Sequence, residues 1–519
     1  MKVEPWKVPQ KDGETFFHPD PETWATAARA SHSDSQMRSF FGLNSLEVRR
    51  EAGWPEGPVV VSAHQPVLFY PGLWVKALAA SSLADALGWT AVHKITDQDA
   101  PGEADGWVPQ ETPGGLKPFP LAWSRPDQPY AFQNAPKKAL WDEALRLSAS
   151  SGLPPVHEGN EFFSKRLQLS WNASRDWDDW HDACLRVLDQ ASGTERLVKR
   201  ASHIWDRPSF RKFLAIWFSD VPAFCGAYNR ALNRYRTDQN IQHPLTPVPN
   251  LAVEKGWQET PFWTATPELG RETLWVKHES GGVLLSSGRD GEVFHWEMSG
   301  GGEALAGAPW RLWPKALPQS LYTRLFLADF FIHGLGGGFY EPVNDLFLEE
   351  LGAGPGAPFG VVSTTLWLSP EETGKVQSQS EKMERIPYWR RALEKNPEYL
   401  LQRQGDWIRE LPPSLATACR EASMTPTFNG AVRTKAELLE GLKDPKRRAE
   451  AGAGVKEWNL FWAERFGPLY ALFEASQGGL EALRARREGL SYRLYAFFCY
   501  SPGRFAALKE TVDRMIRKG

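Results

Sequence analysis

The residues with the clearest chemical potential lie in a short segment that begins with His64 and Gln65 and runs through Gly72 to Lys76. It follows an apolar run at 58–63 and opens a helical pattern, so a buried strand is predicted to turn into a helix. Backbone amides at such a helix start, with His64 and Gln65 as donors and Lys76 as a charge, can hold a phosphate or a carboxylate. The alternative is a turn fixed by proline around a histidine that is satisfied within the protein. Spacing alone leaves both interpretations open.

Two carboxylates, Asp97 and Asp99, follow a second short strand that is predicted at 91–96. A pair of this kind can orient an amine or a ribose, bind Mg²⁺, or act as a general base. The alternative is a polar turn that caps the next element, because aspartate is common in turns.

A third segment begins at His333, contains Gly336, Gly337 and Gly338, and ends at Tyr340. Glycines let a backbone approach a ligand closely and offer amides to a phosphate, and the two ring side chains would line that ligand. The alternative is a helix stop between two packed helices.

The elements that must position these segments follow from periodicity. A strand at 58–63, a helix at about 72–88 and a strand at 91–96 predict a right-handed parallel βαβ unit. Ligands of parallel sheets bind at the carboxyl ends of the strands, so the first two segments are expected to face one crevice.

The glycine segment is predicted to follow an apolar helix over 318–333. The resulting order of helix, glycines and helix matches neither GxGxxG after a strand nor GxxxxGK[ST], which argues against a dinucleotide or P-loop motif. Residues 238–310 are predicted to be rich in β-strands, and the chain from about 370 onward is predicted to be helical.

Composition narrows the class of protein. A formal net charge of -3 gives no reason to expect nucleic acid or an anionic membrane as a partner, and no apolar run is long enough for a membrane span. The four cysteines are far apart and form no CxxC, which is typical of reduced thiols in a cytoplasm. HExxH and GxSxG are absent, so zinc protease and serine hydrolase readings are disfavoured and no metal is assigned.

Three blocks of residues resemble known proteins. The first block contains His64-Gln65-Pro66, Pro71-Gly72, Trp74 and Lys76. The second block is Asp97-x-Asp99. The third runs from Leu325 to Gly337 and continues with Tyr340 and Asp345. They resemble a group of uncharacterised bacterial proteins and, more distantly, the bacillithiol-biosynthesis cysteine-adding enzyme family. His64-Gln65 stands where that family has a pair of glutamines.

This resemblance implies a Rossmann-like parallel-sheet core over residues 1–370 with an inserted α+β region at about 101–310. It also implies a mainly helical region at 371–519 that serves as a dimerisation arm and whose last helix returns to the core. The family is assigned to joining cysteine to an amino-sugar malate conjugate, and nucleotide binding is associated with it.

The resulting expectation is a cytoplasmic enzyme, a ligase or transferase, that joins an amino acid or another carboxylate to a small amine by forming a C–N bond. ATP or another nucleotide is the expected cofactor, and the protein is expected to be a homodimer. His64, Asp97 and Asp99 would act in catalysis, and the substrate or nucleotide would be bound by Gln65, Gly72, Lys76, His333, Gly336, Gly337, Gly338 and Tyr340. The alternatives are a non-catalytic nucleotide or sugar-nucleotide binding protein on the same fold and a mainly structural dimer.

Overall fold

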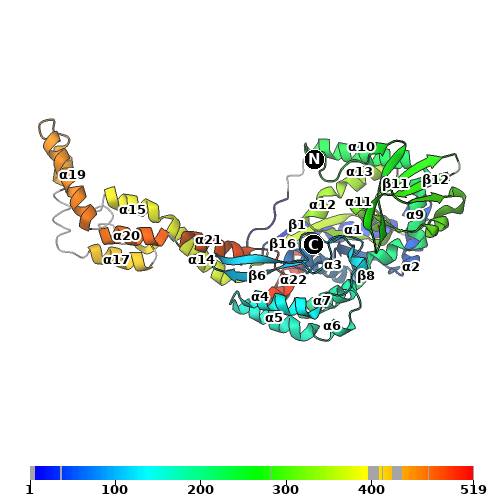
Figure 1. Ribbon diagram of the computed structural model, residues 1–519, viewed down its shortest axis with the longest axis horizontal. Coiled ribbons are helices and arrows are strands. Elements are labelled where there is room, and N and C mark those ends of the chain that lie inside the picture. Colours follow the sequence, from blue (N-terminus) through cyan, green and yellow to red (C-terminus); the bar gives the residue numbers. More distant parts are fainter. Residues whose placement is uncertain are drawn as a thin grey trace. The chain divides into compact units, whose positions relative to one another are not determined.

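The computed structural model describes residues 6–35, 38–280, 282–395, 408–411, 413–423, 435–465, 467–477 and 479–517. They form two compact units (Figure 1). The first unit comprises the described residues up to Gln110, Pro118–Leu368 and the residues from Arg493 onward. The second comprises Glu111–Lys117 and Ser369–Tyr492.

The first unit is built on a six-stranded sheet with the order β1-β16-β15-β4-β5-β8. Its strands are β1 (Thr15–His18), β4 (Val59–His64), β5 (Thr90–Ile95), β8 (Leu197–Arg200), β15 (Phe330–His333) and β16 (Phe359–Thr364). All neighbours run parallel except β1, which is antiparallel to β16. Helices flank this sheet, so the predicted α/β fold with a Rossmann-like core is confirmed.

The predicted βαβ unit is present as β4, α3 (Pro71–Leu87) and β5. Pro71 fits the first turn of α3 because its missing N–H would be unpaired there anyway, and Gly88 ends the helix in the left-handed conformation at φ 70°. Helix α3 is buried along most of its length, since it packs on the sheet and against α22 (Pro502–Arg517). Burial of this kind is expected of a helix that is apolar on all sides.

The strand order places a topological switch beside β4. From β4 the chain continues to β5 and β8 on one side, whereas β15 and β16 lie on the other. Crevices for ligands form at the carboxyl ends of the strands at such a switch. The sheet therefore favours a site between the ends of β4 and β15.

The predicted helix over 318–333 is wrong in its second half. The chain forms α11 (Ala316–Tyr322), continues through the π-helical turn η4 (Thr323–Leu327), and then enters the strand β15. The run Phe330–Ile332 is fully buried between β4 and β16, where aromatic and β-branched side chains suit a central strand. Periodicity cannot separate a short apolar strand from a buried helix. The glycines therefore follow a strand rather than the predicted helix, and they open a helix, α12, as predicted.

The remaining elements of the first unit are mostly helices and one antiparallel sheet. The helices are α1 (Trp24–Ser35), α2 (Ser45–Glu51), α4 (Lys138–Ala149), α5 (Pro154–Leu167), α6 (Ser170–Ala173), α7 (Trp177–Ser192), α8 (Ala201–Trp205), α9 (Pro208–Ser219), α10 (Val221–Gln239), α12 (Leu335–Tyr340) and α13 (Pro342–Glu350). The second sheet contains β9 (Val253–Glu254), β10 (Trp257–Thr266), β11 (Gly270–Glu279), β12 (Gly282–Ser287), β13 (Val293–Trp296) and β14 (Arg311–Pro314). This sheet confirms the prediction of a β-rich stretch at 238–310.

Two short hairpins complete the strands, formed by β2 (Ser39–Phe40) with β3 (Leu43–Asn44) and by β6 (Gly106–Thr112) with β7 (Gly115–Leu121).

The second unit is helical, as predicted for the chain beyond about 370. Its helices are α14 (Pro370–Glu384), α15 (Ile386–Lys395), α17 (Pro413–Ser423), α19 (Arg448–Arg465), α20 (Gly467–Gln477) and α21 (Leu480–Ser491). They enclose a small core of their own that includes Ile386, Leu415 and Phe473. Among the described residues, no helix is both long and apolar enough to cross a membrane.

Candidate functional site

A cavity of about 490 Å³ opens at the topological switch of the first unit. Its volume lies within the range of small-molecule sites. Of the residues singled out from the sequence, its lining includes His64, Gln65, Gly72, Lys76, Asp99, His333, Gly336, Gly337 and Tyr340. The structure thus brings the three predicted segments to one cavity. Asp97 and Gly338 are not among the lining residues.

Lys76 is the most unusual charged group of the cavity. Its side chain comes from the second turn of α3, is only 4% exposed, and donates from Nζ to the carbonyl oxygen of Ala63 at 2.9 Å. Burial lowers the pKa of Lys76 to about 7, so the ammonium is partly charged near neutral pH. Gly334 faces the lysine stem, where a β carbon would lie 3.3 Å from the Lys76 Cδ.

His64 ends strand β4 as a neutral ring. Its Nδ1 lies 3.0 Å from the carbonyl oxygen of Gln65, which can only accept, so Nδ1 carries the proton and Nε2 keeps a lone pair. Burial lowers the pKa of His64 well below its usual value, and the charge of Lys76 lowers it further. The ring therefore offers the cavity an acceptor rather than the donor to an anion expected from the sequence.

Arg493 is a cationic residue of the cavity that the sequence did not single out. Its Nη2 donates to Ser363 Oγ at 2.9 Å and to the carbonyl oxygen of Thr364 at 3.2 Å. Its Nε is buried and has no hydrogen-bond partner in the described part of the chain. Gly72 makes room for it, since a β carbon at that position would lie 2.6 Å from Nη2. No spacing rule connects Arg493 with Gly72, because only the fold brings the C-terminal segment to the start of α3.

Asp99 lines the cavity, and its carboxylate already forms an ion pair within the protein. Its Oδ2 accepts from Gln65 Nε2 at 3.0 Å, and its Oδ1 accepts from Arg271 Nη1 at 2.8 Å. Arg271 belongs to β11, so this carboxylate links the turn after β4 to the second sheet. The pairing leaves the positive charges of Lys76 and Arg493 without an equivalent carboxylate among the described lining residues.

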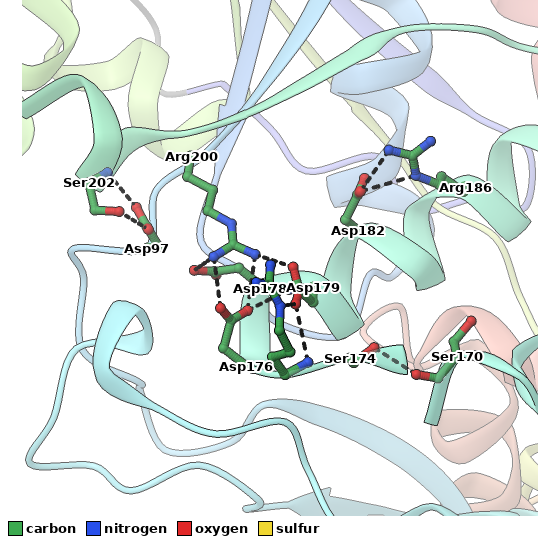
Figure 2. Close-up of polar contacts among 11 residues, drawn as sticks. Asp97, Ser170, Ser174, Asp176, Asp178, Asp179, Asp182, Arg186, Arg200 and Ser202 are labelled. Atoms are coloured by element: carbon green, nitrogen blue, oxygen red, sulfur yellow. Dashed lines mark hydrogen bonds and ion pairs between the residues drawn. The ribbon is translucent and has the colours of Figure 1, made fainter. Parts of the chain in front are cut away.

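Asp97 contacts a different set of residues from its neighbour Asp99. Figure 2 shows its carboxylate directed at Ser202 in the first turn of α8. It accepts from the backbone N–H of Ser202 at 2.8 Å and from the hydroxyl of the same residue. Asp97 thus caps a helix, but α8 lies far along the chain and is not the next element named in the alternative for the acidic pair.

Asp97 also belongs to a buried pair of carboxyl groups. Burial raises the pKa of Asp97, and burial together with the charge of Asp97 raises the pKa of Asp178 well above its usual value. Asp178 lies in the first turn of α7, next to Arg200 and the helix-capping Asp176 (Figure 2). One proton shared by Asp97 and Asp178 avoids burying two neighbouring negative charges.

His333 ends strand β15 and is backed by a buried charge network. Its Nε2 lies 3.1 Å from Glu341 Oε2, and Glu341 is fully buried. The other oxygen of Glu341 accepts from Arg324 at 3.0 Å and from Asn344 at 3.1 Å. Burial alone would raise the pKa of Glu341, but the contact with His333, the charge of Arg324 and the hydrogen bond from Asn344 lower it to about 2. Glu341 is therefore an ionised carboxylate.

The glycines after His333 have distinct roles. Gly337 lies against the ring, where a β carbon would be 2.5 Å from His333 Nδ1. Gly338 packs away from the cavity, since a β carbon there would lie 2.3 Å from Val361 and 2.6 Å from Trp6. Of the predicted ligand-binding glycines, Gly338 is thus explained by close packing.

None of the four cysteines lines this cavity. The four cysteines are buried and unpaired, and burial raises the pKa of Cys184, Cys225, Cys419 and Cys499, which disfavours a reactive thiolate. In the described ranges, no group of three or more His, Cys, Asp or Glu residues is arranged to hold a metal ion.

Comparison with protein-family models and with curated proteins gave no match to this chain. The resemblance to the cysteine-adding enzyme family therefore depends on the motif residues alone, and the function must be argued from the cavity.

Proposed function

We propose that the protein is an enzyme that joins a carboxylate, such as an amino acid, to a small amine by forming a C–N bond. The acid would bind in the cavity between the ends of β4 and β15. Its anionic group would lie beside Arg493 and Lys76, and the amine would be held by acceptors such as His64. The resemblance implies this class of activity, and we propose the cavity as its site.

The observation that carries the proposal is the charge balance of this cavity. Lys76 and Arg493 both line it, whereas the carboxylate of Asp99 is already paired with Arg271. A buried ammonium and a guanidinium on the wall of one cavity favour an anionic ligand. The proposal therefore predicts a substrate with a carboxylate or phosphate group.

Amide formation requires an activated acid, and a nucleoside triphosphate would supply the activation by converting the carboxylate to an acyl phosphate or acyl adenylate. Support for a phosphate-bearing co-substrate is that Gly72, in the first turn of α3, and Arg493 both line the cavity. ATP or another nucleotide is thus the proposed co-substrate.

The test is a product screen. The protein is incubated with Mg²⁺-ATP and pools of amino acids, small carboxylic acids and amino sugars, and condensation products are sought by mass spectrometry. We expect a product whose mass equals acid plus amine minus water, formed only in complete mixtures. Stabilisation by a ligand in a thermal-shift assay without any product would instead favour the non-catalytic binding protein.

Lys94 offers a matched control for Lys76. Both lysines are buried, and burial lowers the pKa of each to about 7, but Lys94 bonds to Thr323 and does not line the cavity. Lys76→Met should abolish product formation, whereas Lys94→Met should retain it in the folded protein. Equal losses in both variants would contradict a specific role for Lys76.

The homodimer remains a proposal for the second unit. Support comes from large apolar side chains on its surface, including Tyr388 at 65% and Leu460 at 63% exposure. Sedimentation velocity tests it: a dimer is expected, and Leu460→Glu should shift the protein toward the monomer. A monomer at all concentrations would contradict the proposal.

A further inference from the structure

We propose that His333 is the general base of the reaction and that Glu341 fixes its tautomer. This inference rests on the proposed C–N bond formation, and it assigns to His333 a role beyond lining the ligand. It is carried by a histidine at the cavity wall whose far nitrogen faces a buried carboxylate.

The ring proton of His333 is positioned by Glu341. Glu341 is ionised and can only accept hydrogen bonds, so the His333 Nε2 that lies 3.1 Å away must carry the proton. Both atoms are buried, and neither forms an aligned hydrogen bond within the described part of the chain, so the attraction between them is electrostatic. In a neutral ring the other nitrogen, Nδ1, is then unprotonated.

Nδ1 of His333 lies on the side of the ring away from Glu341. It is beside Gly337, a cavity residue, at the place where an alanine β carbon would be only 2.5 Å away. Gly337 therefore packs closely against Nδ1, and any side chain at this position would block the nitrogen. His333 therefore has the arrangement of a general base: an acceptor toward the substrate and a carboxylate behind it.

The two cavity histidines differ in the groups that contact them. His64 is held by the carbonyl oxygen of Gln65, which carries no full charge, and Lys76 opposes its protonation. His333 also has a lowered pKa because of burial, but the charge of Glu341 counteracts that effect. A base must become positively charged during proton transfer, and only His333 has a carboxylate to stabilise that charge.

In the reaction, the amine nitrogen attacks the carbonyl carbon of the acyl phosphate and forms the C–N bond. The bond from that carbon to the phosphate oxygen breaks, and the phosphate leaves with the electron pair. The proton lost by the amine moves to Nδ1 of His333, and the imidazolium is stabilised by Glu341. Release of the proton to water restores the ring.

Glu341→Gln gives a sharp test because the network dictates how the amide must lie. Arg324 and Asn344 both donate to one oxygen of Glu341, so the glutamine oxygen must take that place. The amide NH₂ then faces His333 Nε2, which becomes an acceptor, and the ring proton moves to Nδ1. The variant therefore presents a donor to the cavity, and we expect turnover to fall by about 100- to 10,000-fold.

Asp345→Asn is the matched control. Asp345 bonds to the same Arg324 at 2.7 Å but is not a partner of His333. This variant should keep both the tautomer and most of the turnover.

The tautomer is measured by nitrogen NMR on protein labelled with ¹⁵N-histidine, with the His333 signals assigned through His333→Asn. At pH 7.5 we expect an unprotonated Nδ1 in the wild-type protein and in Asp345→Asn, and a protonated Nδ1 in Glu341→Gln. The charged groups that face the ring are Glu341, Arg324 and Lys76, so its titration is followed in Lys76→Met as well.

A protonated Nδ1 in the wild-type protein would overturn the inference, and this measurement needs no variant to fold. Wild-type turnover and pH profile in a folded Glu341→Gln would overturn it too, while leaving the proposed function intact. If no mixture gives a product, the proposed function and the role of His333 as its base both fail, even where the NMR result bears out the tautomer.

Discussion

Lys76 should make anion binding depend on pH. The folded protein lowers the pKa of this lysine to about 7, so its charge is present below that value and lost as the pH rises above it. An anion beside Nζ favours the charged form, so affinity should be highest below pH 7 and decrease toward pH 9. Calorimetric titration with sulfate, whose own charge is constant over this range, measures the effect.

In Lys76→Met the affinity should be about 10- to 100-fold lower at pH 6 and nearly independent of pH, as expected for the loss of a charged hydrogen bond. Lys94→Met should retain the pH dependence of the wild type. A pH dependence that persists in Lys76→Met would assign it to another group.

Substitution of Asp97 should mainly affect stability, whereas substitution of Asp99 should mainly affect binding. Asp97→Asn should lower the free energy of unfolding by about 1 to 3 kcal/mol, because Asp97 caps α8 through Ser202 in the interior. Asp99→Asn should leave stability within about 0.5 kcal/mol and change binding in the cavity, since Asp99 is partly exposed there. Chemical denaturation and sulfate titration of both variants decide the matter. A stable Asp97→Asn with impaired binding would reverse the assignment.

At the scale of elements, the start of α3 and the C-terminal segment form one wall of the cavity, and Gly72 is where they meet. Alanine favours a helix more than glycine by about 1 kcal/mol, so Gly72→Ala should not unfold the protein through helix propensity. Its β carbon would lie 2.6 Å from the Arg493 guanidinium, which must shift, and 3.0 Å from the backbone oxygen of Thr364. We expect sulfate affinity to fall about as far as in Arg493→Met, with a melting temperature within a few degrees of the wild type. Unchanged affinity in Gly72→Ala would show that Arg493 is not a ligand.

The sequence was most informative for elements whose signals are local. The βαβ unit around α3 was predictable because Pro71 and Gly88 mark its helix and apolar runs mark its strands. Strand β15 was assigned to a helix because a short apolar run has no distinguishing period. Strands β1 and β8 were missed because they are short edge strands without strong alternation.

Some residues of the candidate site could be predicted from local sequence signals, and others could not. His64, Lys76 and His333 could be named because they adjoin turns with recognisable residues. Arg493 could not, because only tertiary packing brings it to Gly72. The different roles of Asp97 and Asp99 could not be predicted either, since they depend on Ser202 and Arg271, which approach from other elements.

At the scale of the whole molecule, the strand order of the first unit explains why distant segments share a cavity. Strands β4 and β15 are neighbours although their connections lead in opposite directions, so their carboxyl ends delimit the crevice. The same order places Ser363 at the end of β16 beside Arg493. The site is thus a consequence of topology, with loops and helix starts supplying the chemical groups.

The central claim is that this crevice is an anion site built by Lys76 and Arg493. Crystals grown or soaked in selenate test it directly, because anomalous scattering from selenium locates the anion. We predict a strong peak in the cavity, within hydrogen-bond distance of Arg493 and close to Lys76. Selenate at other positions with none in this cavity would contradict the claim.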